Sequence, residues 1–117
     1  MTDEKKRGGI WVGLKGLKAE HRAADYLRGL GMTVERSRYR AADGEIDLIV
    51  RDGETLVFVE VKSAQRLGEG AMRVDRDKRT RLKSAARVYL KEHPAARIRF
   101  DVLEESDAGL RLIKNAF

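Results

Sequence analysis

The 117-residue sequence contains no cysteine, one proline, two histidines and no long apolar segment. Without cysteine, the chain can form neither a disulfide nor a thiolate metal site. Zinc sites rely mainly on cysteine and histidine, so two histidines do not favour zinc. No apolar run approaches the roughly 20 residues of a membrane span, and the N-terminus lacks the apolar core of a secretory signal. We therefore expect a cytoplasmic protein with no membrane association, whose metal ligands would be oxygen atoms.

Positive charge is in excess, because 25 lysines and arginines outnumber 19 aspartates and glutamates and give a net charge of +6. Such an excess favours a polyanionic partner, of which nucleic acid is the commonest. The alternative is a well-solvated surface, since 38% of the residues are charged and both signs are mixed. The position of the basic residues must decide between these interpretations.

The hydropathy pattern predicts a single domain that contains both helices and strands. Residues 1–13 are polar and glycine-rich, so we expect a flexible N-terminal arm followed by one domain over residues 14–117. Amphipathic periodicity and β-branched runs predict the remaining elements. These are helices over about 17–30 and 75–92, and strands over about 32–38, 45–50, 56–62, 97–103 and 110–113.

This order of elements predicts an α/β fold with a mixed central β-sheet flanked by helices. The first three strands can form an antiparallel meander. The second helix then returns the chain parallel to the third strand, with the usual right-handed crossover. The expected core is therefore αβββαβ, with room for one more short strand at the C-terminus.

Three charged residues interrupt two predicted strands that are otherwise strongly apolar: Asp47, Glu60 and Lys62. An unpaired charge in such a strand would cost on the order of several kcal/mol, so each residue needs a partner. Antiparallel pairing sets the start of one strand beside the end of the next, which brings Asp47 and Glu60 to the same edge of the sheet. Glu45 shares a face with Asp47, and Lys62 shares a face with Glu60.

Charged residues also lie on the apolar stripes of the two predicted helices, Glu20 on the first and Lys78 on the second. A carboxylate in this position is unexpected unless a group inside the fold receives it. Three acids and a lysine that converge on one edge predict a functional site in which carboxylates hold one or two divalent cations. Oxygen ligands favour Mg²⁺ or Mn²⁺.

The same residues also have purely structural interpretations, which the sequence leaves open. A charged residue can be satisfied by a neighbouring side chain, by a turn or by solvent. The alternatives are a Glu60–Lys62 salt bridge, a turn cap made by Asp47, an ion pair of Glu20 with Arg40 or Lys78, and solvation of Glu45.

Clustered carboxylates beside a lysine suit the hydrolysis of a phosphodiester bond. A divalent cation polarises the phosphoryl oxygen and lowers the pKa of a bound water. The Lys62 ammonium would favour hydroxide and stabilise the charge that grows on the phosphate. This chemistry needs no cysteine or serine nucleophile.

At these residues the chain resembles the PD-(D/E)xK nuclease superfamily, with Asp47 as the first acid and Glu60-Val61-Lys62 as the second-strand signature. The sequence around these motifs, at residues 44–49, 57–62 and 99–102, resembles the YraN family of bacterial proteins. The resemblance extends over about residues 14–117. This resemblance implies a restriction-endonuclease-like fold, similar to that of archaeal Holliday-junction resolvases, and magnesium as the cofactor. It also implies a set of site residues: catalytic Asp47, Glu60 and Lys62, metal-binding Glu20, Asp47 and Glu60, and the adjacent acid Glu45.

Basic residues are dense in the segment after the third predicted strand and on the second helix. The YraN family usually has an arginine two residues beyond the lysine, where this chain has Ala64, and Arg66 is the candidate substitute. No aromatic residues are interleaved for stacking on bases, so contacts to the nucleic-acid backbone are expected. The alternative is a solvated helix face. The predicted contacts come from Arg66, Arg73, Arg76, Lys78, Arg79 and Arg81.

Together these features predict a metal-dependent endonuclease that selects branched or junction DNA by structure rather than by sequence. The alternative is a non-catalytic nucleic-acid-binding module of the same fold, acting as an accessory in DNA processing or uptake. A third interpretation is an assembly protein whose acid–lysine cluster stabilises the sheet. Symmetric cutting of a junction needs two active sites, so such an enzyme would act as a homodimer.

Overall fold

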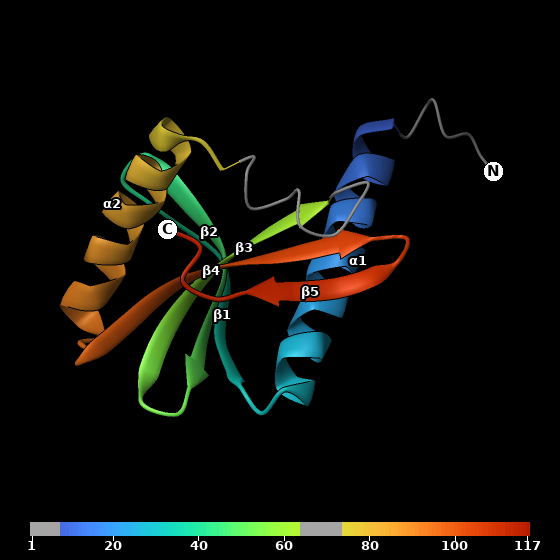
Figure 1. Ribbon diagram of the computed structural model, residues 1–117. Coiled ribbons are helices and arrows are strands. Elements are labelled where there is room, and N and C mark those ends of the chain that lie inside the picture. The colour runs from blue at the N-terminus through green and yellow to red at the C-terminus, as the bar shows by residue number, and fades with distance from the viewer. Residues whose placement is uncertain (1–7, 64–73) are drawn as a thin grey trace.

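The computed structural model describes the backbone of residues 8–63 and 74–117, and the side chains of these ranges from residue 19 onward. Figure 1 shows a central sheet with one helix on each face. The elements are α1 (Gly8–Gly29), β1 (Thr33–Ala41), β2 (Gly44–Asp52), β3 (Thr55–Ser63), α2 (Arg76–Glu92), β4 (Arg97–Ser106) and β5 (Gly109–Ile113).

The five strands form one mixed sheet in the order β1-β2-β3-β4-β5. The pairs β1/β2, β2/β3 and β4/β5 are antiparallel, whereas β3 and β4 are parallel. A parallel pair requires a crossover, and α2 provides it. The α/β fold predicted from the sequence is therefore confirmed, including the short strand at the C-terminus.

The first helix is longer than the periodicity predicted. It begins at Gly8 rather than near residue 17, so residues 8–13, where the sequence suggested an arm, are helical. Residues 1–7 lie outside the described residues. The helix is closed by Gly31, whose φ of +95° suits glycine, and by a hydrogen bond from the Met32 N–H to the Leu27 carbonyl. Neither described helix combines the length and apolar character that crossing a bilayer requires.

Strands β2 and β3 carry apolar side chains on both faces because each face packs against a helix. On β3, Leu56 and Phe58 belong to the core cluster beneath α2, whereas Val57 and Val59 belong to the cluster beneath α1. This explains the continuous apolar character of these strands. Polar side chains at their ends are consequently close to the core.

The start of β2 is held tightly against α2. A Cβ atom added at Gly44 would lie 2.2 Å from the carbonyl oxygen of Arg81, so only glycine fits this approach. The helix itself begins at a capping residue, Asp75, whose side chain accepts a hydrogen bond from the Lys78 N–H at 2.8 Å. Together these contacts bring the first turn of α2 next to the charged residues of β2.

Candidate active site

The β2–β3 ladder ends where the candidate site begins. Paired residues run from Asp52 and Thr55 to Leu48 and Val59. Beyond this point a side chain of β2 replaces the backbone as the hydrogen-bond partner of β3, because Asp47 Oδ2 accepts a hydrogen bond from the Val61 N–H at 2.8 Å. Asp47 therefore does not cap the turn, which was one structural alternative, but is fixed against β3.

Asp47 and Glu60 line one pocket, as the antiparallel register predicted. The pocket has a volume of about 230 Å³, and Glu45 lies in its wall on the β2 side. Helix α2 forms the opposite wall. The lining residues are Asp43, Gly44, Glu45, Asp47, Glu60, Lys78, Arg81 and Leu82.

Glu60 is close enough to Asp47 to affect the ionisation of the Asp47 carboxyl group. Burial and the negative charge of Glu60 together raise the pKa of Asp47 to about 7, although the hydrogen bond from Val61 opposes the shift. Glu60 itself is buried. Two crowded carboxylates of this kind are stabilised by additional positive charge, and their oxygen atoms fit a divalent cation such as Mg²⁺ or Mn²⁺.

Lysines supply positive charge to this pair, and the nearer one comes from α2. The Lys78 Nζ lies 2.6 Å from Glu60 Oε2, whereas the Lys62 Nζ lies 3.8 Å from the same oxygen. The predicted Glu60–Lys62 contact is present, but Lys78 makes the closer one. Lys78 was predicted as a nucleic-acid contact; its place on the apolar stripe of the helix was the signal for an internal partner.

The two lysines also affect each other. Burial and the charge of Lys78 lower the pKa of Lys62, with Glu60 opposing. Although burial acts against it, the hydrogen bond to Glu60 raises the pKa of Lys78. Lys78 is therefore held in its charged form beside Glu60, while Lys62 is the lysine more readily deprotonated.

Glu20 lies near this site but in a different pocket. Its partner is Arg38, with Nη1 3.9 Å from Oε1, and not Arg40 or Lys78 as the sequence suggested. Arg40 instead lies 3.7 Å from Glu45. Burial, opposed by the charge of Arg38, raises the pKa of Glu20.

The three predicted metal ligands are only partly brought together. Glu20 lines a different pocket from Asp47 and Glu60, although its charge contributes to the raised pKa of Asp47. Within the described part of the chain, however, no three Asp, Glu or His side chains are grouped so that they could surround an ion. Asp47 and Glu60 share one pocket, and both the bound cation and the three-acid ligand set stay predictions.

One acid at this edge was missed by the sequence analysis. Glu104 is fully buried on β4 and lies in register with Lys62 of β3. Residues in register on parallel strands are neighbours, so Glu104 adds a buried carboxylate beside the lysine. The signal was the pair Glu104-Glu105 directly after an apolar run on the predicted parallel strand.

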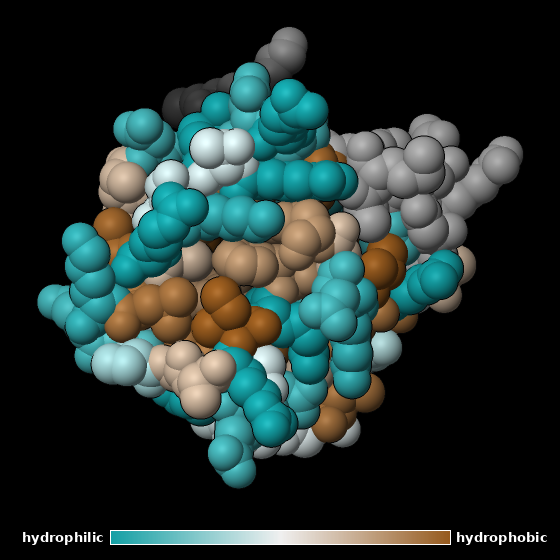
Figure 2. Space-filling view, turned by 60° about the vertical axis from the view of Figure 1, so that its left-hand side comes forward, coloured by the Kyte–Doolittle hydropathy of each residue, from teal (hydrophilic) through white to brown (hydrophobic). Residues whose placement is uncertain are grey.

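The predicted nucleic-acid contacts have different environments. Arg76 and Arg81 are exposed on α2, together with Lys83, Arg87 and Lys91. Arg79 instead serves the fold, because its Nε donates to the Val74 carbonyl at 2.9 Å and its guanidinium lies over the Phe117 ring. Figure 2, in which the α2 side of Figure 1 comes forward, shows mostly hydrophilic side chains around a smaller hydrophobic area. Ala64, Arg66 and Arg73 lie outside the described residues.

Comparison with known proteins gives consistent matches over most of the chain. The sequence profile of the uncharacterised protein family UPF0102 matches residues 19–104. A UPF0102 protein of Halorhodospira halophila is 41% identical over 105 residues, which cover 88% of this chain and 86% of that protein. One from Ralstonia nicotianae is 42% identical over 110 residues, covering 87% and 85% of the two chains. One from Ruegeria is 35% identical over 121 residues, covering 100% of this chain and 98% of the relative.

Proposed function

The chain belongs to the UPF0102 family, the YraN family that its motifs resemble, and from its site geometry we propose that it is a metal-dependent endonuclease. The observation that carries this proposal is the pocket that Asp47 and Glu60 share, together with the ammonium groups of Lys62 and Lys78 near Glu60 Oε2. The pocket rim includes the exposed residues Asp43 and Arg81, which suits a large substrate approaching from solvent.

In this proposal the chain's own residues position the reacting groups. The Val61 N–H orients Asp47, and Lys78 orients Glu60, so both carboxylates have fixed positions before a substrate binds. A bound divalent cation would supply Lewis-acid activation of the phosphoryl group and of water. Lys62, the lysine with the lowered pKa, would hold the attacking water and stabilise charge that develops on the phosphate.

The proposed substrate is DNA, bound through its backbone and selected for branched or junction structure. Arg81 is exposed and lines the pocket, and it suits contacts with phosphates together with the other exposed basic residues of α2, including Arg76. No aromatic stacking platform accompanies them among the described residues of α2. We further propose that the enzyme acts in the cytoplasm and, for symmetric junctions, as a homodimer.

Two measurements on one preparation test this proposal. Purified protein is incubated with branched and linear DNA in Mg²⁺ or Mn²⁺, beside the variants Lys62→Ala and Asp47→Ala. We expect metal-dependent cutting of branched DNA by the wild type and none by either variant. Equal cutting by Lys62→Ala would assign the activity to a contaminant. A rise in melting temperature on adding Mn²⁺, abolished by Asp47→Ala, would support a metal site at these carboxylates.

A second candidate function is a non-catalytic nucleic-acid-binding module. It is favoured by the short Lys78–Glu60 contact, because an internal ammonium already neutralises the acid that a catalytic cation would use. This alternative predicts DNA binding with no Mn²⁺-dependent change in melting temperature and no cleavage of any substrate. A metal response that depends on Asp47 would exclude it.

A further inference from the structure

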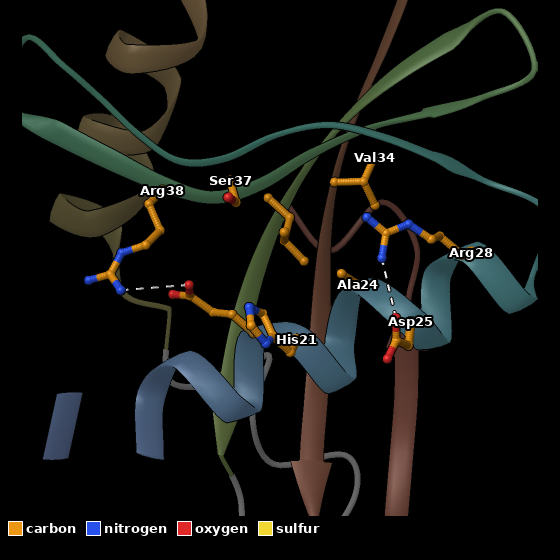
Figure 3. Close-up of a pocket in the computed structure, with 9 residues that line it drawn as sticks. His21, Ala24, Asp25, Arg28, Val34, Ser37 and Arg38 are labelled. Atoms are coloured by element: carbon orange, nitrogen blue, oxygen red, sulfur yellow. Dashed lines mark hydrogen bonds and ion pairs between the residues drawn. The ribbon is translucent and has the colours of Figure 1, made fainter. Parts of the chain in front are cut away.

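A second pocket lies on the α1 side of the sheet, opposite to the face that carries α2 and the proposed active site (Figure 1). It is formed between α1 and β1, with Leu48 of β2 at its base, and its volume is about 390 Å³ (Figure 3). This volume falls within the range of small-molecule binding sites in proteins. Glu20, which the sequence grouped with the catalytic acids, lines this pocket and not the one that contains Asp47 and Glu60.

The pocket has an apolar base and charged ends, and a nucleotide can make both kinds of contact. Ala24 and Leu48 are buried, and Val34 lies beside them. Figure 3 shows Arg38 at one end of the pocket and Arg28 at the other. An apolar base of this kind can pack against a nucleobase or sugar, while guanidinium groups bind phosphate oxygens.

The charged groups at the two ends are available to a ligand. Arg38 lies 3.9 Å from Glu20, and Arg28 lies 3.2 Å from Asp25. The two arginine side chains are 48% and 56% exposed, so these ion pairs contribute little to stability and can be exchanged for phosphate.

Arg38, which lines this pocket, has an unusual backbone conformation. Its φ is +53°, in the left-handed region that residues other than glycine rarely adopt. The β1–β2 ladder passes from the Ser37–Leu48 pair to the Tyr39–Ile46 pair at this point, and Tyr39 enters the core beneath α2. Such backbone outliers persist where the surrounding structure enforces them, and they gather at functional sites.

The two pockets lie on opposite faces of the sheet (Figure 1), and consecutive residues of β2 contribute to them. Asp47 lines the active-site pocket, and the next residue, Leu48, forms the base of the second pocket. Because β1 is the edge strand of the sheet, a nucleic-acid strand at Asp47 can pass around this edge into the second pocket.

We propose that this pocket holds an unpaired nucleotide of the substrate, in a DNA strand that passes around β1 from the phosphodiester bond that is cut. The inference rests on the proposed nuclease function and gives it a basis for structure selection. A base in duplex DNA is stacked and hydrogen-bonded, and removing it costs energy, whereas an unpaired base at a branch point enters without this cost.

Binding without cleavage tests the proposal. A labelled flap DNA with unpaired nucleotides and a fully paired nicked duplex of equal length are titrated in EDTA and followed by fluorescence anisotropy. Ser37→Leu fills the pocket from an exposed position, and Arg38→Gln removes one guanidinium. Arg97→Gln removes an equal charge from an exposed site at the start of β4, where it does not line either pocket. Melting curves establish that each variant is folded.

We expect the wild type and Arg97→Gln to bind the flap about tenfold more tightly than the duplex, and Ser37→Leu and Arg38→Gln to lose most of this preference. A wild type that binds both substrates equally would overturn the proposal. So would folded pocket variants that keep the full preference. If Arg38→Gln weakens binding of the duplex as much as binding of the flap, Arg38 contacts a backbone phosphate and not an unpaired nucleotide. This result would also overturn the proposal.

The outcome is separable from that of the proposed function. Loss of the flap preference in the pocket variants, combined with no cleavage by the wild type in Mg²⁺ or Mn²⁺, would support the nucleotide pocket and overturn the nuclease. Metal-dependent cleavage that needs Lys62, combined with an unchanged preference in the pocket variants, would support the nuclease and overturn the nucleotide pocket.

Discussion

The carboxylate of Asp47 accepts a hydrogen bond from the backbone N–H of Val61, the residue between Glu60 and Lys62. This contact fixes the first candidate acid against the strand that carries the second acid and the lysine. It also forces two carboxylates together in a partly buried place, so that the pKa of Asp47 rises to about 7. A backbone hydrogen bond therefore fixes Asp47 in the proposed site, while burial and the neighbouring carboxylate of Glu60 disfavour the charged form of Asp47.

The strain at Asp47 predicts a specific dependence of stability on pH. Because the pKa of Asp47 rises from 3.8 to about 7 on folding, the folded state binds more protons and the wild type loses stability as pH rises between these values. Asp47→Asn keeps an oxygen that can accept the Val61 hydrogen bond. In EDTA, we expect this variant to be about 2–4 kcal/mol more stable than the wild type near pH 8 and equal to it near pH 4. Urea denaturation across this range measures the difference, and a less stable variant at high pH would contradict the expectation.

Lys78 is predicted to act as an internal counter-ion for Glu60. Lys78→Met removes the ammonium 2.6 Å from a buried carboxylate, and we expect it to reduce the metal-free stability by about 1–3 kcal/mol. Mn²⁺ should then raise the melting temperature of the variant more than that of the wild type, because the ion replaces the lost charge. Arg76→Met, an exposed change on the same helix, should shift stability by less than about 0.5 kcal/mol. A variant as stable as this control would show that Lys78 does not stabilise Glu60.

Gly44 is predicted to contribute to both stability and cleavage, because it sets the distance between β2 and α2. In Gly44→Ala the new Cβ would meet the Arg81 carbonyl oxygen at 2.2 Å, so the helix must move and carry Lys78 with it. We expect a loss of about 1–3 kcal/mol and reduced DNA cleavage. Gly29→Ala is the matched control, since its Cβ would meet no atom within 4 Å. Chemical denaturation should leave this control unchanged or slightly more stable.

Asp101 is predicted to serve the fold and not the site. It is fully buried, and its carboxylate accepts bonds from the Arg99 guanidinium at 2.9–3.1 Å and from the Asn115 N–H at 3.0 Å. Asp101→Ala should cost about 3–5 kcal/mol, because it leaves Arg99 without its main partner. The exposed change Asp107→Ala should cost less than about 0.5 kcal/mol.

The readout that separates fold from site in this variant is the response to metal. Melting curves of Asp101→Ala are started at a low temperature, where the variant is still folded. Mn²⁺ should raise its melting temperature by the same amount as that of the wild type. A variant that melts early and also loses the metal response would place Asp101 in the site.

The elements and their order were determined by the sequence itself. Apolar residues on both faces of residues 45–50 and 56–62 predicted central strands, and β2 and β3 are central strands covered by two helices. The meeting of Asp47 with Glu60 also followed from local information, because antiparallel register depends only on the positions of the turn and the strands. The early start of α1 at Gly8 did not follow, since the periodicity of residues 8–16 is weak.

Only the tertiary structure decided which charges of the helices meet those of the sheet, and which charges meet across the parallel strands β3 and β4. Lys78 contacts Glu60 because Gly44 allows α2 to approach β2, and Arg38, which has a left-handed backbone conformation on β1, lies near Glu20 of α1. Glu104 lies beside Lys62 because a crossover aligns β4 with β3 in parallel. Each contact joins segments far apart in the chain, and its distance depends on how helices and strands pack, which hydropathy patterns do not encode.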